Sequence, residues 1–316
     1  MRRAMMLIPA LLCSCLLFAG VWTFAPDDAW FPVPLADRNH PRFSLSFPYY
    51  FEQEIDTLQR GERGGLREFL EFGGVKSLLR YASESDTPMG AELSLGAGLI
   101  TLFDSFADRL DNLGWEGSGF LTLNFRTGEH TVARFGFHHL SSHVGDEYLA
   151  NYGVIGLPME DDADLAKGAT YGFYYVRDSL LLGISFRPSH LVHLYLEARY
   201  SMRMFTYMYC YNRFPWQVRM GLELFVPTGD EAIGTWYLAL HADAFQESSW
   251  YPSSTIQAGF LVKAEGKAEQ VRIGLEYQWG RVAIAAFNHV DDMGPDSWDE
   301  VRKERYFAIG AWYDFS

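Results

Sequence analysis

The stretch from Thr131 to Tyr148 holds the residues whose types and spacing could do chemistry. His139, Ser141 and His143 occur there at every second position. Alternate side chains of a strand share one face, about 6.5–7 Å apart, so an imidazole on either side can reach the Ser141 hydroxyl. A serine becomes a nucleophile when a base takes its proton. The row therefore predicts a hydrolase site with Ser141 as nucleophile and His139 or His143 as base.

A third group usually fixes the tautomer of such a base. Asp146 and Glu147 follow the row closely and are the carboxylates predicted for this role, with Asn151 as an amide alternative. Ser142 points to the opposite face and is not predicted to react. The other interpretation of the row is a polar cap where a strand leaves a membrane, without catalysis.

The element that must position this row is a strand, and similar strands recur along the chain. Its outward face begins with Ala133, Phe135 and Phe137, opposed by Arg134 and His138. The same alternation is found at residues 91–103, 115–126, 192–200, 216–226, 236–243, 271–278 and 307–315. Such runs, separated by turns, are typical of an all-β fold: a single antiparallel transmembrane β-barrel of about 12 strands (10–14). A soluble sandwich is the alternative, and Trp or Tyr at the ends of the apolar faces favours the barrel.

The N-terminal region predicts export. Arg2 and Arg3 precede an apolar run, so residues 1–25 are predicted to be a signal peptide. Residues 26–63 are predicted to be an irregular, proline-rich segment with a first strand at Phe43–Phe47, and residues 64–316 to be the barrel. A loose lipoprotein box ending at Cys15 leaves lipidation there as an alternative to simple cleavage. The predicted location is the bacterial outer membrane, with lipid as the partner.

Composition excludes several classes of protein. Lys and Arg number 26 against 40 Asp and Glu, a formal net charge of −14, which argues against nucleic-acid binding. Two of the three cysteines lie in the predicted signal, so no intrachain disulfide is expected. No cofactor is predicted, apart from the alternative that acidic residues bind Ca²⁺ rather than face solvent. These candidates are Asp146 with Glu147, the cluster Glu160, Asp161, Asp162 and Asp164, and the acids between 291 and 300.

Loop lengths predict the orientation of the barrel. Tight turns are predicted at Thr127–Glu129, Asp178-Ser179 and Gly280-Arg281, and long connections at Gly145–Lys167 and Val290–Arg305. Outer-membrane barrels keep short turns on the periplasmic side. By strand parity the strand with His139 then runs outward, and the row lies at its extracellular end, facing lipid.

The predicted lumen carries both signs of charge. Charges enclosed in a narrow barrel must be paired or hydrated, so a plugged lumen is favoured over a wide pore, and a narrow channel remains the alternative. The lumen residues are Glu92, Glu116, Arg134, Glu197, Arg199, Arg219, Glu223, Arg272 and Glu276.

Two resemblances bear on function. The run from His139 to Ser142 is similar to the His-x-Ser signature of outer-membrane phospholipase A and of the lipid A deacylases, although Ser142-His143 stands where those enzymes usually have Asn-Gly. The stretches WFPVPLADRNHPRF and HLSSHVGDEYL resemble an uncharacterised exported bacterial family, domain of unknown function 1207. That family usually has Pro directly after Leu-Ala-Asp, where Arg38 stands here. The first resemblance implies a lipid acyl hydrolase at the outer rim; the second implies a barrel and export, without an activity. A non-catalytic barrel, either a narrow channel or a structural protein, is the competing hypothesis.

Overall fold

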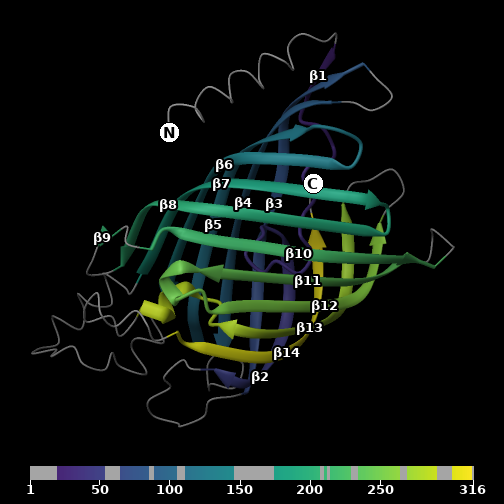
Figure 1. The fold of residues 1–316 in the computed structure, drawn as a ribbon. Helices are drawn as coiled ribbons and strands as arrows, with labels where there is room; N and C mark the ends of the chain where they lie inside the picture. Colours follow the sequence, from purple (N-terminus) through teal and green to yellow (C-terminus); the bar gives the residue numbers. More distant parts are fainter. Residues whose placement is uncertain are drawn as a thin grey trace, which may run out of the picture.

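The computed structural model describes residues 20–53, 65–84, 89–104, 111–145, 174–206, 210–211, 214–228, 234–263, 269–289 and 301–314, and they are almost entirely β-structure (Figure 1). Two short 3-10 helices interrupt the strands, η1 (Gln246–Ser248) and η2 (Ala285–His289). The strands are β1 (Gly20–Phe24), β2 (Phe43–Gln53), β3 (Gly65–Ser83), β4 (Gly90–Asp104), β5 (Asp111–Arg126), β6 (Thr131–Val144), β7 (Tyr174–Ser189), β8 (Val192–Thr206), β9 (Cys210–Tyr211), β10 (Trp216–Pro227), β11 (Thr235–Phe245), β12 (Pro252–Lys263), β13 (Gln270–Arg281) and β14 (Lys303–Asp314).

Within these residues, twelve antiparallel strands close into one barrel, which confirms the predicted fold class. Strands β3 to β8 and β10 to β14 pair in chain order, and β2 closes the ring between β14 and β3. The remaining two strands are short additions: β1 pairs with the end of β3, and β9 with the end of β8. The strand predicted within residues 26–63 is therefore a barrel strand, β2, while β1 lies inside the predicted signal segment. No helix of the described residues is long and apolar enough to cross a membrane.

The two faces of the wall follow the alternation in the sequence. On β14 the outward Phe307 and Ile309 are 42% and 57% exposed, whereas the inward Tyr306 and Ala308 are fully buried. Every charged residue predicted for the lumen is buried, with an exposed fraction of 6% or less. An apolar outer band around a polar interior is the arrangement expected of a barrel in lipid.

Two of the three predicted tight turns are wrong. The turn at 127–130 does connect β5 to β6, but Asp178 and Ser179 lie inside β7, and Gly280 and Arg281 end β13. Asp and Ser favour turns because they can satisfy nearby backbone groups. Here Asp178 bonds to His139 and Ser179 to Ser201, so the neighbouring strands satisfy them instead. Strand parity still places the end of β14 and the 127–130 turn at one end of the barrel and the His139–His143 row near the other.

The lumen is filled by two segments of the chain. Residues 26–42, between β1 and β2, run inside the barrel in purple (Figure 1), and we refer to them as the plug segment. Its Leu35 packs with Tyr237 and Leu261, and its Trp30 and Phe31 with Val132 and Tyr195. Near the other end, η2 and the residues before it pack into the largest buried cluster, with Phe287 and Ile284 fully buried. The interior is thus a packed core, as the paired charges predicted.

Candidate functional site

The predicted row lies on the outer face of β6, with its residues side by side. Ser141 Oγ is 3.1 Å from His143 Nε2, a hydrogen bond between a hydroxyl and an imidazole. The His143 ring stacks on Trp115 of β5, with centroids 4.0 Å apart and planes at 16°. Trp115 is the direct register partner of His143, so strand pairing fixes this stack. The arrangement holds an imidazole nitrogen in position to take the serine proton.

His139 has a different partner. Its Nδ1 is 2.7 Å from Asp178 Oδ1, and the two residues face each other directly across the β6–β7 pair. The His139 side chain is 46% exposed and that of Asp178 is 20% exposed. Asp178 therefore orients the His139 ring, a role that the sequence analysis gave to Asp146 or Glu147. Those two residues lie outside the described residues. Asp178 was missed because it lies 39 positions away along the chain and its sequence context indicated a turn.

The wall beside Ser141 carries little side-chain bulk. Gly117 faces Ser141 across the β5–β6 pair, and Gly119 faces His139. A Cβ placed on Gly119 would meet only a carbonyl oxygen of Gly96, at 3.6 Å. The wall beside Ser141 is therefore free of side-chain bulk on the Gly119 side, while the Trp115 ring lies 3.8 Å from where a Cβ on Gly117 would be.

Behind the row, the lumen braces the same two strands. Ser142 Oγ accepts a hydrogen bond from the Ala286 amide at 2.9 Å, and Glu116 Oε2 accepts one from the Ala285 amide at 3.0 Å. Ser142 is fully buried, so the prediction that it faces the lumen is confirmed. These bonds tie η2 to β5 and β6 directly behind Trp115, Ser141 and His143.

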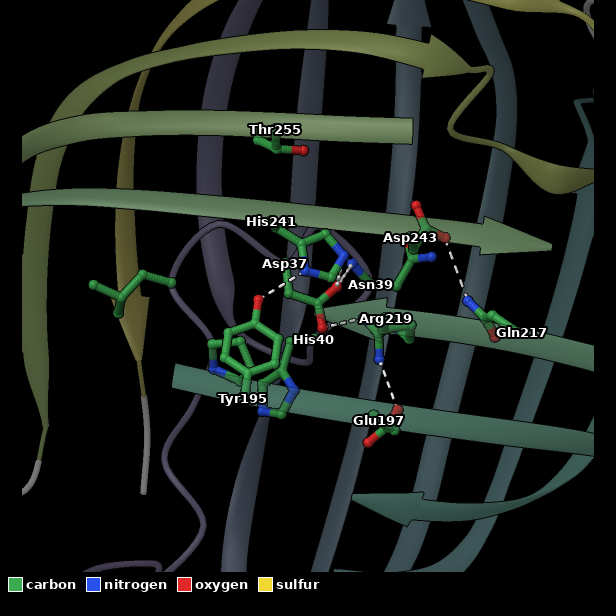
Figure 2. Close-up of polar contacts among 12 residues, drawn as sticks. Asp37, Asn39, His40, Tyr195, Glu197, Gln217, Arg219, His241, Asp243 and Thr255 are labelled. Carbon is green, nitrogen blue, oxygen red and sulfur yellow. Dashed lines mark hydrogen bonds and ion pairs between the residues drawn. The ribbon is translucent and has the colours of Figure 1, made fainter. Parts of the chain in front are cut away.

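A second polar cluster lies in the lumen, centred on Asp37 of the plug segment (Figure 2). Asp37 forms an ion pair with Arg219, and its other oxygen lies 3.7 Å from His241 Nε2. Arg219 also contacts Glu197 at 3.2 Å, and Glu197 in turn pairs with Arg134 and Arg199. Because every one of these charges is buried, each depends on the others for compensation.

Further polar contacts hold the plug segment along its length. Trp30 N donates to Glu92 at 3.0 Å, and Leu35 N donates to Glu223 at 2.6 Å. Arg38 pairs with Glu304 at 2.7 Å. Sequence reasoning predicted the lumen charges but not this partner, although the Leu-Ala-Asp-Arg run between prolines was the available signal.

Asp37 and His40 of the plug segment have lowered pKa values. Burial alone would raise the pKa of Asp37, but Arg219 and the neighbouring cations hold it well below its usual range. Burial lowers the pKa of His40 to about 3, helped by Arg134 and Arg42 against the opposing effect of Asp37. His40 Nε2 is also buried without a hydrogen-bond partner among the described residues. The ion pair and the neutral imidazole are thus both features of the folded interior.

No group of three or more His, Cys, Asp or Glu in the described part of the chain is arranged to hold a metal ion. The acidic residues suggested for Ca²⁺, at 146–147, 160–164 and 291–300, all lie outside that part.

Comparison with known proteins returns structural likenesses only. No family model and no curated protein matches the chain, so the resemblance to domain of unknown function 1207 stays a prediction. Solved outer-membrane structures do match over most of their length. Within the described residues the fold is a closed antiparallel β-barrel of twelve strands.

Three of these structures illustrate the range. The transport unit of the autotransporter AIDA-I from Escherichia coli is 9% identical, with a TM-score of 0.42, over 92% of this chain and 95% of that one. The CymD monoaromatic hydrocarbon channel is 10% identical, with a TM-score of 0.39, over 89% of each chain. LpxR from Salmonella typhimurium is 9% identical, with a TM-score of 0.32, over 86% of this chain and 100% of that one.

Proposed function

We propose that this protein is an outer-membrane acyl hydrolase that cleaves ester-linked acyl chains of membrane lipid, with Ser141 as nucleophile. The observation that carries the proposal is the hydrogen bond of 3.1 Å between Ser141 Oγ and His143 Nε2 on the outer face of the barrel. Lipid surrounds that face, so ester groups reach the serine without entering the lumen. The packed lumen supports a site on the outside over one that depends on passage through the barrel.

The reaction follows ordinary acyl transfer. As Oγ of Ser141 attacks the ester carbonyl carbon, His143 Nε2 takes the hydroxyl proton. The bond between the acyl carbon and the alcohol oxygen breaks, and the imidazolium returns the proton to the leaving alcohol. Water, deprotonated by the same nitrogen, then hydrolyses the acyl-serine and releases a fatty acid.

The assignment of the base changes with the geometry. Sequence reasoning put His139 first and His143 second, whereas the hydrogen bond to Ser141 favours His143. His139, held by Asp178, lies on the other side of Ser141, two residues away on the same face. Both imidazoles lie two residues from Ser141 on the same face of β6, so substitutions are required to distinguish them.

The test is to incubate the refolded protein with phospholipid and with lipid A, with and without Ca²⁺, and to weigh the products. A serine–base unit fails when either member is lost. Ser141→Ala and His143→Ala should therefore each lower kcat at least about a hundredfold, and the double variant little further. His139→Ala should retain more activity than His143→Ala.

The matched control is Ser254→Ala, which removes an outer-face hydroxyl from β12 and should leave activity within about twofold of wild type. Release of no fatty acid from either lipid would overturn the proposal. Equal activity of wild type and Ser141→Ala would do the same.

A further inference from the structure

A β-bulge on β8 changes which face of the wall one arginine occupies. Up to Ser201, the even residues of β8 face outward and the odd ones face the lumen, as for Tyr200 and Arg199. In the pairing with β7, Asp178 is opposite Arg203 and Ser179 is opposite Ser201, which leaves Met202 as an extra residue. Continued alternation would send Arg203 into the lumen. The bulge sends it outward instead, where it is exposed, and turns Met204 inward, where it is fully buried.

The bulge places this arginine beside the Ser141 site. Arg203 is opposite Asp178, the residue that holds His139. Its guanidinium carbon lies 4.9 Å from the centroid of the Phe205 ring. Phe205 pairs with Val176, and Val176 pairs with Ser141, so the ring beside which the guanidinium lies is on the same rung of the sheet as the serine. Two inter-strand spacings separate them, about 10 Å between backbones.

An arginine on the outer face of a barrel has a cost unless something binds it. Arginine is unfavourable against hydrocarbon and becomes tolerable near the headgroups, where a phosphate is available. Asp178, the nearest carboxylate by register, already uses Oδ1 to bond His139. The guanidinium fork matches phosphate oxygens with two parallel hydrogen bonds.

From these observations we infer that Arg203 binds the phosphate of the lipid whose ester is cleaved at Ser141. The inference rests on the proposed function and adds its substrate class: phosphate-bearing lipid rather than neutral ester. Two lipids carry that chemistry at an outer rim, a glycerophospholipid and a phosphorylated lipid A. With the phosphate held at Arg203, the glycerol or sugar esters lie within reach of the serine. Gly119 leaves the adjacent wall clear for the acyl chain.

The kinetic test compares two substrates with the same acyl chains in mixed micelles, phosphatidylglycerol and diacylglycerol. Arg203→Gln should raise KM for phosphatidylglycerol about ten- to a hundredfold, because it removes charge-assisted hydrogen bonds to the phosphate. Its activity on diacylglycerol should stay within about twofold of wild type. Arg203→Lys should recover part of the loss, since it keeps the charge without the fork. Lipid A with and without its phosphates, assayed in the same way, distinguishes the two natural sources.

The matched control is Arg305→Gln, which removes an exposed arginine from β14, where Arg305 lies 3.8 Å from Glu52. It should change neither substrate's KM. Equal losses of Arg203→Gln on both substrates, or no loss on phosphatidylglycerol, would overturn the inference.

A binding measurement separates failure of the inference from failure of the proposed function. In the Ser141→Ala background, which cannot turn over ester, native mass spectrometry counts the phosphatidylglycerol retained from detergent. Ser141→Ala should retain it, and Ser141→Ala with Arg203→Gln should not. If wild type hydrolyses nothing yet this difference holds, the lipid subsite stands without the hydrolase. If both variants retain the lipid equally, the subsite is wrong whatever the activity.

Discussion

Glu197 shows how closely the single residues of the lumen depend on one another. Its carboxylate contacts Arg134, Arg199 and Arg219, so one negative charge lies among three positive charges. Asp37 supplies a second negative charge to Arg219 from the plug segment. Removing one member of a buried ion pair leaves an uncompensated charge, which costs more than the intact pair contributes.

We therefore expect Asp37→Asn to lower the free energy of unfolding by about 3–5 kcal/mol. Urea titration of the protein refolded into vesicles measures the difference. Asp28→Asn is the control, because its carboxylate pairs with Arg80 near the surface and is 63% exposed. Exposed pairs contribute about 0–1 kcal/mol. Equal effects of the two substitutions would contradict the role given to Asp37.

At the scale of elements, the plug segment contributes one buried histidine, His40, to the acid sensitivity of the fold. His40 has a folded pKa of about 3, against an ordinary value of 6.5, so the unfolded chain binds a proton at mildly acidic pH and the folded chain does not. The contribution of His40 to the free energy of unfolding is therefore fully present above pH 6.5 and falls as the pH drops towards 3. The pKa of Asp37 is lowered, so its contribution is lost only below its ordinary value of 3.8.

Acidification from pH 7 to pH 4.5 should consequently remove the contribution of His40 to the stability of the barrel. The temperature at which the heat-modifiable gel band shifts should fall over this range. His40→Gln, which cannot be protonated, should flatten that dependence while Asp37 remains ionised. An unchanged slope in His40→Gln would show that other groups set the acid response.

At the scale of the whole molecule, the filled lumen argues against the narrow channel. The plug segment occupies one part of the interior and η2 with its neighbours another, each packed against apolar wall residues. Both would have to move before solute could cross. A barrel filled in this way gives its outer face a rigid support.

Purified wild-type protein in a planar bilayer should accordingly pass no steady ion current. Arg219→Ala should also stay silent, because the packing of Leu35 and Phe31 remains. Steady currents altered by Arg219→Ala, in a protein that turns over no lipid, would favour the channel instead.

The sequence by itself determined the barrel, its two faces and the position of the Ser141 row. Lipid outside and charge inside select the side chains of each strand locally, so alternation survives in the sequence and Arg134, Glu197 and Arg272 could be assigned to the lumen. Strands without clean alternation were missed. Among them, β3 carries Glu68 and Lys76 in its long run, and β7 contains the apparent turn at Asp178.

Only the tertiary structure decided which side chains meet. The bonds of Asp178 to His139, Asp37 to Arg219 and Ala286 to Ser142 join residues far apart in the chain, and their formation depends on strand register and on the path of a loop. Neither the strand register nor the path of the loop can be read from a local sequence pattern. The bulge at Met202 is the sharpest case, since one extra residue moves Arg203 from the lumen to the outer face. A period of two determines faces only while pairing stays in register, and register is set by the neighbouring strands.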